Sequence, residues 1–235
     1  MDSHSGNVQI NNLVLQGIGA DARAQMSAAF EELHLEHGRV LYQAEDTIDY
    51  LYFPEDSMIS VVTTTRAGQT AEAGVIGFEG FSGLEGLLYG GPSFNLHIVQ
   101  LAGRAHRVRK DEIKREFDRG GDVQKAALRF TRALMSQFSQ TALCNRIHTA
   151  EKRLAKWLLS CHDRAPGDVM YLTQEFIATM LGANRTSVTV AAGELQDAGY
   201  IDYRRGKITM LDRDGLESYS CECYARIRKE YASLT

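Results

Sequence analysis

The sequence has little of what a membrane or secreted protein needs. No apolar run approaches the ~20 residues that cross a bilayer, and the first residues, MDSHSGNVQ, lack the basic start and apolar block of a secretory signal. Four cysteines in a chain of 235 residues do not suggest a disulfide scaffold. These absences favour a cytoplasmic protein without a membrane partner.

Recognisable catalytic patterns are also missing. No glycine-rich phosphate loop precedes a helix, and Ser82, in the segment GFSG, does not lie in a nucleophile elbow. The seven histidines are scattered without the spacing of metal ligands. An enzyme with an active site in the N-terminal half would lack a pattern of acid, base and nucleophile, so we expect no enzyme.

An overall excess of positive charge would indicate a nucleic-acid partner, but the chain has no such excess. The formal net charge is −4, but residues 1–100 carry −10, residues 101–150 carry +6, and residues 151–235 are neutral. Any affinity for DNA must therefore come from a local cluster of cations, because only charges that reach phosphates displace counterions.

Residues 172–195 have the pattern of two short helices joined by a tight turn. The first helix is predicted over residues 174–181, and the Thr173 hydroxyl can cap its first turn. Gly182 follows its last apolar residue, where a left-handed residue usually ends a helix. Asn184 can then cap a second helix that begins directly after it.

The second helix has one apolar and one polar face. Its apolar residues recur at spacings of three and four and share a face: Val188, Ala191, Ala192 and Leu195. Its other face carries Arg185, Thr186, Thr189 and Gly193. In a helix-turn-helix, such a second helix enters the DNA major groove with its N-terminal residues toward base edges. The same scaffold also occurs in small helical domains that do not bind DNA.

A β-hairpin is predicted after this helix. Residues 201–211, IDYRRGKITML, alternate apolar and polar residues on both sides of a turn at Arg205 and Gly206. With Arg204 and Lys207, the cationic tip is typical of the wing of a winged helix, where positive groups reach phosphates beside the groove.

The N-terminal half has a different pattern. Short apolar runs between residues 35 and 108 alternate with turns and predict the strands of a β-sandwich or barrel. These runs are RVLY, YLYF, MISVVTTT, EAGVI, NLHIVQLAG and AHRVR. Before them, residues 20–35 are predicted to form a short amphipathic helix with Met26, Phe30 and Leu33 on one side.

Helices are predicted from residue 110 onward. Residues 110–119 place Ile113 and Phe117 one turn apart, and a long helix follows from Asp122, its expected cap, to about Arg146. We expect one face of this helix to pack on the β-domain and the other on the same helix of a second subunit, burial within one domain being the alternative. The predicted dimerisation seam has heptad-like spacing: Ala127, Thr131, Leu134, Phe138 and Thr141. Further helices are predicted over residues 150–162 and 217–231.

In this order, the elements resemble the Crp/Fnr family of bacterial transcription regulators, from about residue 20 to 215 and most specifically in TQEFIATMLGANRTSVTVAAGELQDAGYIDYRRGKI. The resemblance implies an α+β fold. Residues 1–119 would form a cyclic-nucleotide-binding-like β-roll (a jelly roll), residues 120–148 a long dimerisation helix, and residues 149–235 a C-terminal winged helix-turn-helix. It also implies a homodimer that binds a palindromic operator in double-stranded DNA and contacts RNA polymerase.

Within this resemblance, Arg185 matches the arginine that typically contacts guanine, whose O6 and N7 its fork can bond. Thr186 stands where many members have a glutamate that reads cytosine, and Val190 where the founding members place a second arginine, so the usual half-site is not expected. The residues predicted to bind DNA are Thr173, Gln174, Asn184, Arg185, Thr186, Ser187, Thr189, Arg204, Arg205 and Lys207.

The ligand pattern of the family is altered. Members that bind cyclic AMP combine a Gly-Glu with a later Arg-Ser or Arg-Thr. Here Gly77 is followed by Phe78, Glu79 comes one place late, and no arginine occurs between Arg66 and Arg104. A buried phosphodiester without a cation is poorly compensated, so we expect no cyclic nucleotide and assign no cofactor or metal.

Two alternatives stay open. The N-terminus lacks the cysteine cluster by which oxygen-sensing relatives hold an iron–sulfur centre, but Cys221 and Cys223 allow a redox- or metal-responsive regulator, although cysteines more often serve packing. His97, in an apolar run, is expected to be a core histidine rather than a haem ligand. The second alternative is a ligand-sensing module whose winged helix binds a protein partner.

Overall fold

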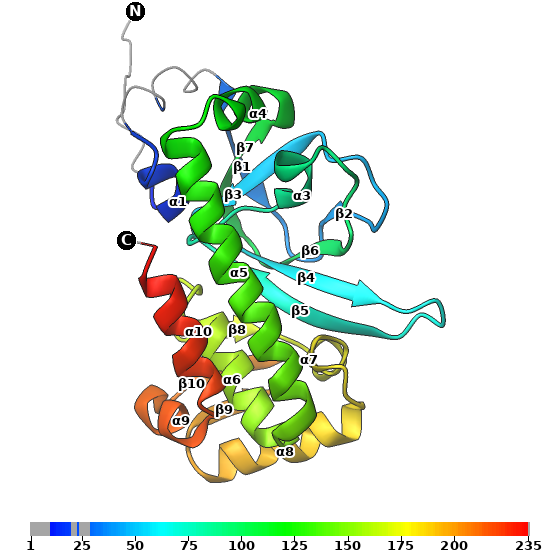
Figure 1. Cartoon of the computed structure of the whole chain (residues 1–235). Coiled ribbons are helices and arrows are strands. Elements are labelled where there is room, and N and C mark those ends of the chain that lie inside the picture. Colours follow the sequence, from blue (N-terminus) through cyan, green and yellow to red (C-terminus); the bar gives the residue numbers. More distant parts are fainter. Residues whose placement is uncertain (1–9, 20–22, 24–28, 235) are drawn as a thin grey trace, which may run out of the picture.

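The computed structural model describes residues 10–19, 23 and 29–234. A β-roll from the N-terminal half and a smaller domain from the C-terminal third lie along one long helix, α5 (Asp122–Ile147), as Figure 1 shows. The short α1 (Leu13–Gln16) lies beside the first turns of α5. None of the helices in the described part of the chain is long and apolar enough to cross a membrane.

Two antiparallel sheets form the β-roll, and the alternating runs predicted six of its strands. The strand order is β1–β7–β3 in one sheet and β2–β6–β4–β5 in the other. The elements are β1 (Glu31–Leu35), β2 (Val40–Tyr42), β3 (Tyr50–Pro54), β4 (Met58–Thr64), β5 (Thr70–Ile76), α3 (Leu84–Leu88), β6 (Leu96–Leu101) and β7 (Gly103–Arg109).

The prediction of a helix over residues 20–35 is wrong at its C-terminal end. Leu33 lies in β1, which pairs with β7 along its whole length. Backbone pairing with a strand that is distant in the sequence outweighs the helical spacing of this segment. Met26 lies outside the described residues, and Phe30 packs edge-on against Phe53 with 5.8 Å between ring centroids.

The long helix is held against the roll by close contacts. The Phe130 ring lies directly over Gly80, where an added Cβ would overlap the ring. Two turns later, Gln137 bonds the backbone of Val75: its Oε1 accepts from the amide N at 2.5 Å, and its Nε2 donates to the carbonyl O at 3.1 Å. Because β5 is an edge strand, these bonds occupy backbone groups that no neighbouring strand reaches.

Helix α4 (Lys110–Asp118) buries Ile113 and Phe117, as predicted. The expected capping by Asp122 is not found: Asp122 is the first residue of α5, and the N-cap is Gly121, with φ 86° and no capping bond from a side chain. A glycine at this position accepts a backbone conformation that other residues rarely adopt.

The predicted dimerisation seam faces the chain's own core. Ala127, Leu134 and Thr141 are only 2%, 6% and 8% exposed, Phe138 packs on the core of the roll, and Thr131 is half-buried. Helical spacing shows which residues share a face but not which face turns inward. The large apolar residues that α5 leaves exposed are Leu128, Met135, Leu143 and Ile147.

Among the described residues of the C-terminal third, seven helices and strands follow α6 (Ala150–His162). These are β8 (Val169–Tyr171), α7 (Gln174–Leu181), α8 (Arg185–Asp197), β9 (Ile201–Arg204), β10 (Lys207–Met210), α9 (Arg213–Tyr219) and α10 (Cys223–Ala232). The prediction of a single helix over residues 217–231 is wrong, because two helices, α9 and α10, occupy this part of the chain. They pack on different cores: Leu216 lies in the core of the C-terminal domain, whereas Ile227 and Tyr231 lie in the core of the roll. The chain therefore breaks between α9 and α10, and α10 packs along α5.

The two domains share an apolar core, in which residues of β4 and β5 pack with residues of α6 and α7. Two buried polar contacts cross this junction. The Arg164 Nε and Nη2 donate to Glu79 Oε1 at 3.0 and 2.6 Å, and Trp157 Nε1 donates to Glu72 Oε1 at 2.9 Å. The junction is therefore fixed both by apolar burial and by directional bonds.

Glu72 is buried in an environment that favours its neutral form. Burial raises the pKa of Glu72 to about 7, against the opposing effects of its bonds with Ser60 and Trp157. The single Ser60 hydroxyl proton faces two acceptors, Glu72 Oε2 at 2.7 Å and Gln100 Oε1. A protonated Glu72 can donate to Ser60, which then donates to Gln100, so protonation removes this conflict.

We predict that Arg164→Ala lowers the free energy of unfolding by about 3–5 kcal/mol, because it leaves Glu79 charged, buried and without its partner. Denaturant unfolding measures this change. Arg228→Ala is the control, since the Arg228–Glu217 pair is largely open to solvent, with side chains 57% and 34% exposed, and should contribute less than about 1 kcal/mol. Equal losses in both variants would contradict a stabilising role for the buried pair.

We also predict that Glu72 makes stability depend on pH. Its folded pKa is raised, so its contribution is fully present below about pH 4.5 and is lost as pH rises through about 7. In Glu72→Gln this dependence should disappear, and the variant should gain roughly 3 kcal/mol relative to wild type between pH 4.5 and 8. Denaturant unfolding of both proteins over this range tests it; a constant difference between them would refute the raised pKa.

Candidate nucleic-acid interface

Local capping builds the helix pair α7–α8 as the sequence predicts. The Thr173 hydroxyl accepts from the Phe176 amide at 3.2 Å, and Gly182 ends α7 with φ 57°. Asn184 Oδ1 accepts from the Ser187 amide at 2.8 Å and so caps α8. Each bond satisfies an amide that the first turn of a helix leaves unpaired.

The two faces of α8 also separate as predicted. The apolar face is buried, with exposed fractions of 4% or less for Val188, Ala191, Ala192 and Leu195. The outward face carries the exposed side chains of Arg185, Thr186, Thr189 and Val190. Thr189 Oγ1 donates to Gln174 Oε1 at 3.0 Å, which links the two helices across this face.

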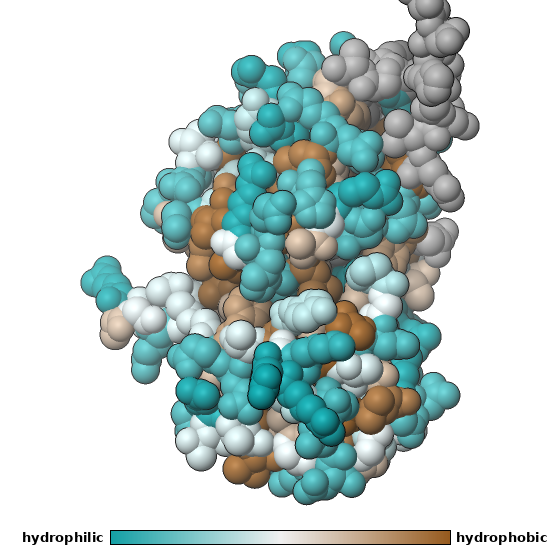
Figure 2. All heavy atoms as spheres, turned by 180° about the vertical axis from the view of Figure 1, so that it is seen from behind, coloured by the Kyte–Doolittle hydropathy of each residue, from teal (hydrophilic) through white to brown (hydrophobic). Residues whose placement is uncertain are grey.

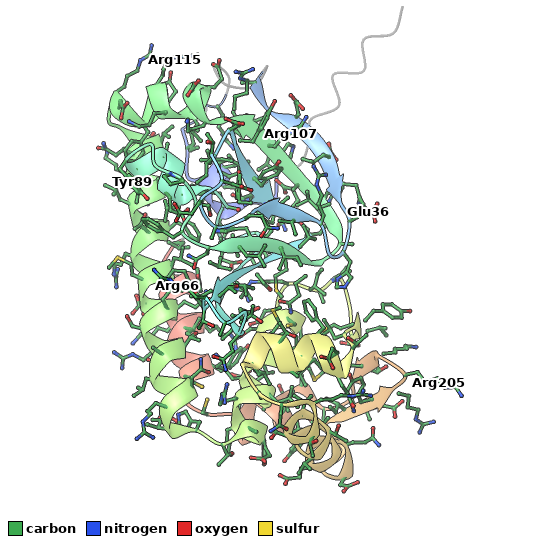
Figure 3. The ribbon with its side chains drawn as sticks, turned by 90° about the vertical axis from the view of Figure 1, so that its right-hand side faces the viewer. Glu36, Arg66, Tyr89, Arg107, Arg115 and Arg205 are labelled. Atoms are coloured by element: carbon green, nitrogen blue, oxygen red, sulfur yellow. The ribbon has the colours of Figure 1, made fainter. Side chains whose placement is uncertain are left out.

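The predicted hairpin is formed by β9 and β10. Its two turn residues, Arg205 and Gly206, have φ values of 52° and 78°, the geometry of a tight type I′ turn. Arg204 lies opposite Lys207, and its Nε bonds Asp202 at 3.0 Å. Figure 3 shows Arg205 extending outward from the hairpin tip, at the end of the molecule away from Arg115.

A hollow of about 540 Å³ lies between the helix pair and the hairpin. Four of the predicted residues line it, namely Thr173, Gln174, Arg185 and Arg205. The remaining predicted residues lie on the same helix or hairpin without lining the hollow: Asn184, Thr186, Ser187, Thr189, Arg204 and Lys207. Cations from α8 and from the hairpin thus border one concave surface, the arrangement that phosphate and base contacts require.

Three residues of this surface were missed at the level of sequence. Glu175 and Tyr203 also line the hollow, and Tyr171, 72% exposed, lies on β8 opposite Lys207. Burial raises the pKa of Tyr203 to about 12, and its ring lines the same hollow as Arg185. A three-residue strand such as β8 carries too few alternations to be recognised from sequence.

In the segment around Glu79, where a ligand pattern was sought in the sequence, the acidic side chain is bonded by other residues of the chain. Glu79 accepts from Arg164 of the junction and from the Gly77 amide at 3.1 Å. His97 lies in the core of the roll, as predicted, where its Nδ1 bonds Ser82 Oγ at 2.7 Å and burial lowers its pKa to about 4. The acidic group of this segment is thus already neutralised by a residue of α6's flanking loop.

Comparisons with known proteins agree with this geometry. Residues 152–219 match the family described as the Crp-like helix-turn-helix domain. The chain carries a Crp-like helix-turn-helix domain. No curated protein sequence matches it significantly.

Solved structures extend the likeness to most of the chain. FixK2 from Bradyrhizobium japonicum is 16% identical with a TM-score of 0.69, over 82% of this chain and 98% of FixK2. A regulator of the crp/fnr family from Eubacterium rectale is 16% identical with a TM-score of 0.68, over 87% and 96% of the two chains. TTHA1359 from Thermus thermophilus is 19% identical with a TM-score of 0.64, over 83% and 98%. The chain therefore has the Crp/Fnr fold: a β-roll, a long helix and a C-terminal helix-turn-helix.

Proposed function

We propose that this protein is a sequence-specific, DNA-binding transcription regulator that acts as a homodimer on a palindromic operator. The observation that carries the proposal is Arg185, exposed at the first turn of a capped α8, beside the concave surface bordered by Arg205 of the wing. In a helix-turn-helix this is the position from which side chains reach base edges in the major groove.

The exposed face of α8 predicts which bases each half-site of the operator contains. Arg185 offers a fork that matches the O6 and N7 of guanine. Val190, 54% exposed on the same helix, offers an apolar contact, which suits the 5-methyl group of thymine. The operator should thus contain a guanine read by Arg185 and a thymine near Val190, flanked by phosphate contacts from Arg204 and Lys207.

The dimer surface that we propose is the exposed apolar stripe of α5. Leu128, Met135 and Ala142 are exposed and seven residues apart, with Leu143 and Ile147 in the last turns. A heptad repeat of this kind suits pairing with the same helix of a second copy. On the opposite side of the molecule, hydrophobic residues form scattered patches among hydrophilic ones (Figure 2). Two copies paired through α5 would place their recognition helices on half-sites about 34 Å apart.

We also propose which ligands and partners DNA binding requires. We expect binding without cyclic AMP, because Glu79 is bonded to Arg164 and no arginine of the segment between Arg66 and Arg104 is available for a phosphate. RNA polymerase in the cytoplasm is the expected protein partner, and no catalysis is expected. Two of the solved structures named above, those from Eubacterium rectale and Thermus thermophilus, are described as transcriptional regulators, which supports DNA rather than a protein as the target of the winged helix.

We predict that Arg185→Ala weakens operator binding by about 1–3 kcal/mol and relaxes the preference at one base pair of each half-site. Genomic duplex fragments selected by the wild-type protein, with and without cyclic AMP, supply the operator. Titrations of that operator at one salt concentration then compare the variants. Lys207→Ala should weaken all sequences equally, because a phosphate contact carries no sequence information.

Arg115→Ala is the matched control, because Arg115 is an exposed arginine at the far end of the molecule from the wing. It should bind like the wild type. Unchanged operator affinity in Arg185→Ala would show that the site is wrongly assigned. Selection of no sequence by the wild type, together with weak dependence on salt, would favour a protein partner for the winged helix.

We predict that Met135→Glu converts the dimer into a monomer, because it places a charge in the centre of the proposed helix pair. Sedimentation velocity at several protein concentrations measures the mass. Leu211→Glu is the control, since Leu211 is 60% exposed and lies outside α5. A wild-type monomer, or a Met135→Glu dimer of unchanged stability, would rule out this surface.

A further inference from the structure

Three of the four cysteines meet at the C-terminal end of α5, although Cys144 is far from Cys221 and Cys223 in the sequence. Cys144 lies in the last turn of α5, Cys221 in the connection between α9 and α10, and Cys223 at the start of α10. All three are buried, with exposed fractions of 0%, 5% and 0%, and they form an apolar cluster of their own. Each of the three therefore faces the other two and not solvent.

The spacing of the sulfur atoms fits a shared metal ion. The Cys144 and Cys221 Sγ atoms are 3.7 Å apart, and all three Sγ atoms lie within 4.8 Å of one another. Tetrahedral Zn²⁺ with Zn–S bonds of about 2.3 Å holds its sulfur ligands roughly 3.8 Å apart. A disulfide needs only about 2.05 Å between the sulfurs, so the two would have to approach much more closely.

The surroundings of the cluster supply what thiolate ligands require. Gln140 Nε2 donates to Cys223 Sγ at 3.1 Å, a bond from a neighbouring amide that orients and stabilises a ligating sulfur.

His148 is the candidate for a fourth donor. It directly follows α5, although neither of its ring nitrogens belongs to the group of ligand atoms that lie within 4.8 Å of one another. The His148 Nε2 is buried and makes no hydrogen bond with any of the described residues, although it lies 3.5 Å from Glu222 Oε1. An imidazole nitrogen is a common ligand for Zn²⁺ beside cysteines.

We propose that Cys144, Cys221 and Cys223 bind one Zn²⁺ ion, with His148 as the fourth ligand. The three thiols lose their protons to solvent as three Zn–S bonds form, and the neutral imidazole coordinates through Nε2. Such a site joins the end of α5 to the connection between α9 and α10. It does not depend on the proposed binding of DNA.

The test uses the full-length, reduced protein and the metal alone. Wild type should retain one equivalent of Zn²⁺ against a chromophoric chelator, and Co²⁺ in its place should show sulfur-to-cobalt charge transfer in the near ultraviolet. Cys221→Ser should weaken Zn²⁺ binding by about 100-fold or more, and His148→Ala by roughly tenfold or more while the sulfur bands remain. Cys161→Ser is the control, because Cys161 is equally buried but bonds Gln100 instead.

Several results would overturn the proposal. One is equal Zn²⁺ affinity in wild type and Cys221→Ser. Another is a reduced wild type that gives no sulfur band with Co²⁺. Because the Co²⁺ spectrum is measured on the wild-type protein, it decides the matter even if a serine variant fails to fold. Circular dichroism of each variant identifies such a failure.

Discussion

The bond between the Gln137 amide and the backbone of Val75 determines how the rest of the molecule is arranged. Strand β5 ends its sheet, and Gln137 takes the place of a neighbouring strand along this edge. The helix can come so close only because Gly74 has no Cβ, which would overlap the Gln137 side chain. Since this bond turns one face of α5 inward, the face with Leu128 and Met135 must lie outside. The surface offered to a second subunit thus follows from how the helix meets the roll.

The junction between the domains uses groups that would otherwise be free for a ligand. Glu79 and Arg164 satisfy each other in a buried pair, and a ligand that displaced either one would leave a buried charge unpaired. Removing one partner of such a pair costs about 3–5 kcal/mol, more than a few polar contacts with a small ligand return. A signal that acts on this roll must therefore either break the pair and release the junction or bind away from it.

The sequence predicted best what local interactions decide. The boundaries of α7, the Thr173 and Asn184 caps and the turn at Arg205 and Gly206 all depend on neighbours within a few residues, and the structure has them as predicted. Contacts between distant segments could not be predicted: the pairing of β1 with β7, the inward turn of Leu134, and the break between α9 and α10. The place of Tyr203 in the candidate interface likewise depends on how the hairpin packs beside α7, which is a contact between separate segments.

The cysteine cluster lies at the C-terminal end of the long helix. The last turn of a helix has carbonyl groups without intrahelical partners and tends to fray at little cost in free energy. In α5 this turn contains Cys144 and the exposed Ile147 of the proposed dimer stripe, and the C-terminal domain begins directly after it. An ion bound to Cys144, Cys221 and Cys223 would tie this turn to α10, which in turn packs along α5 and the roll. Its main effect would therefore fall on the orientation of the two recognition helices in a dimer, and less on the stability of either core.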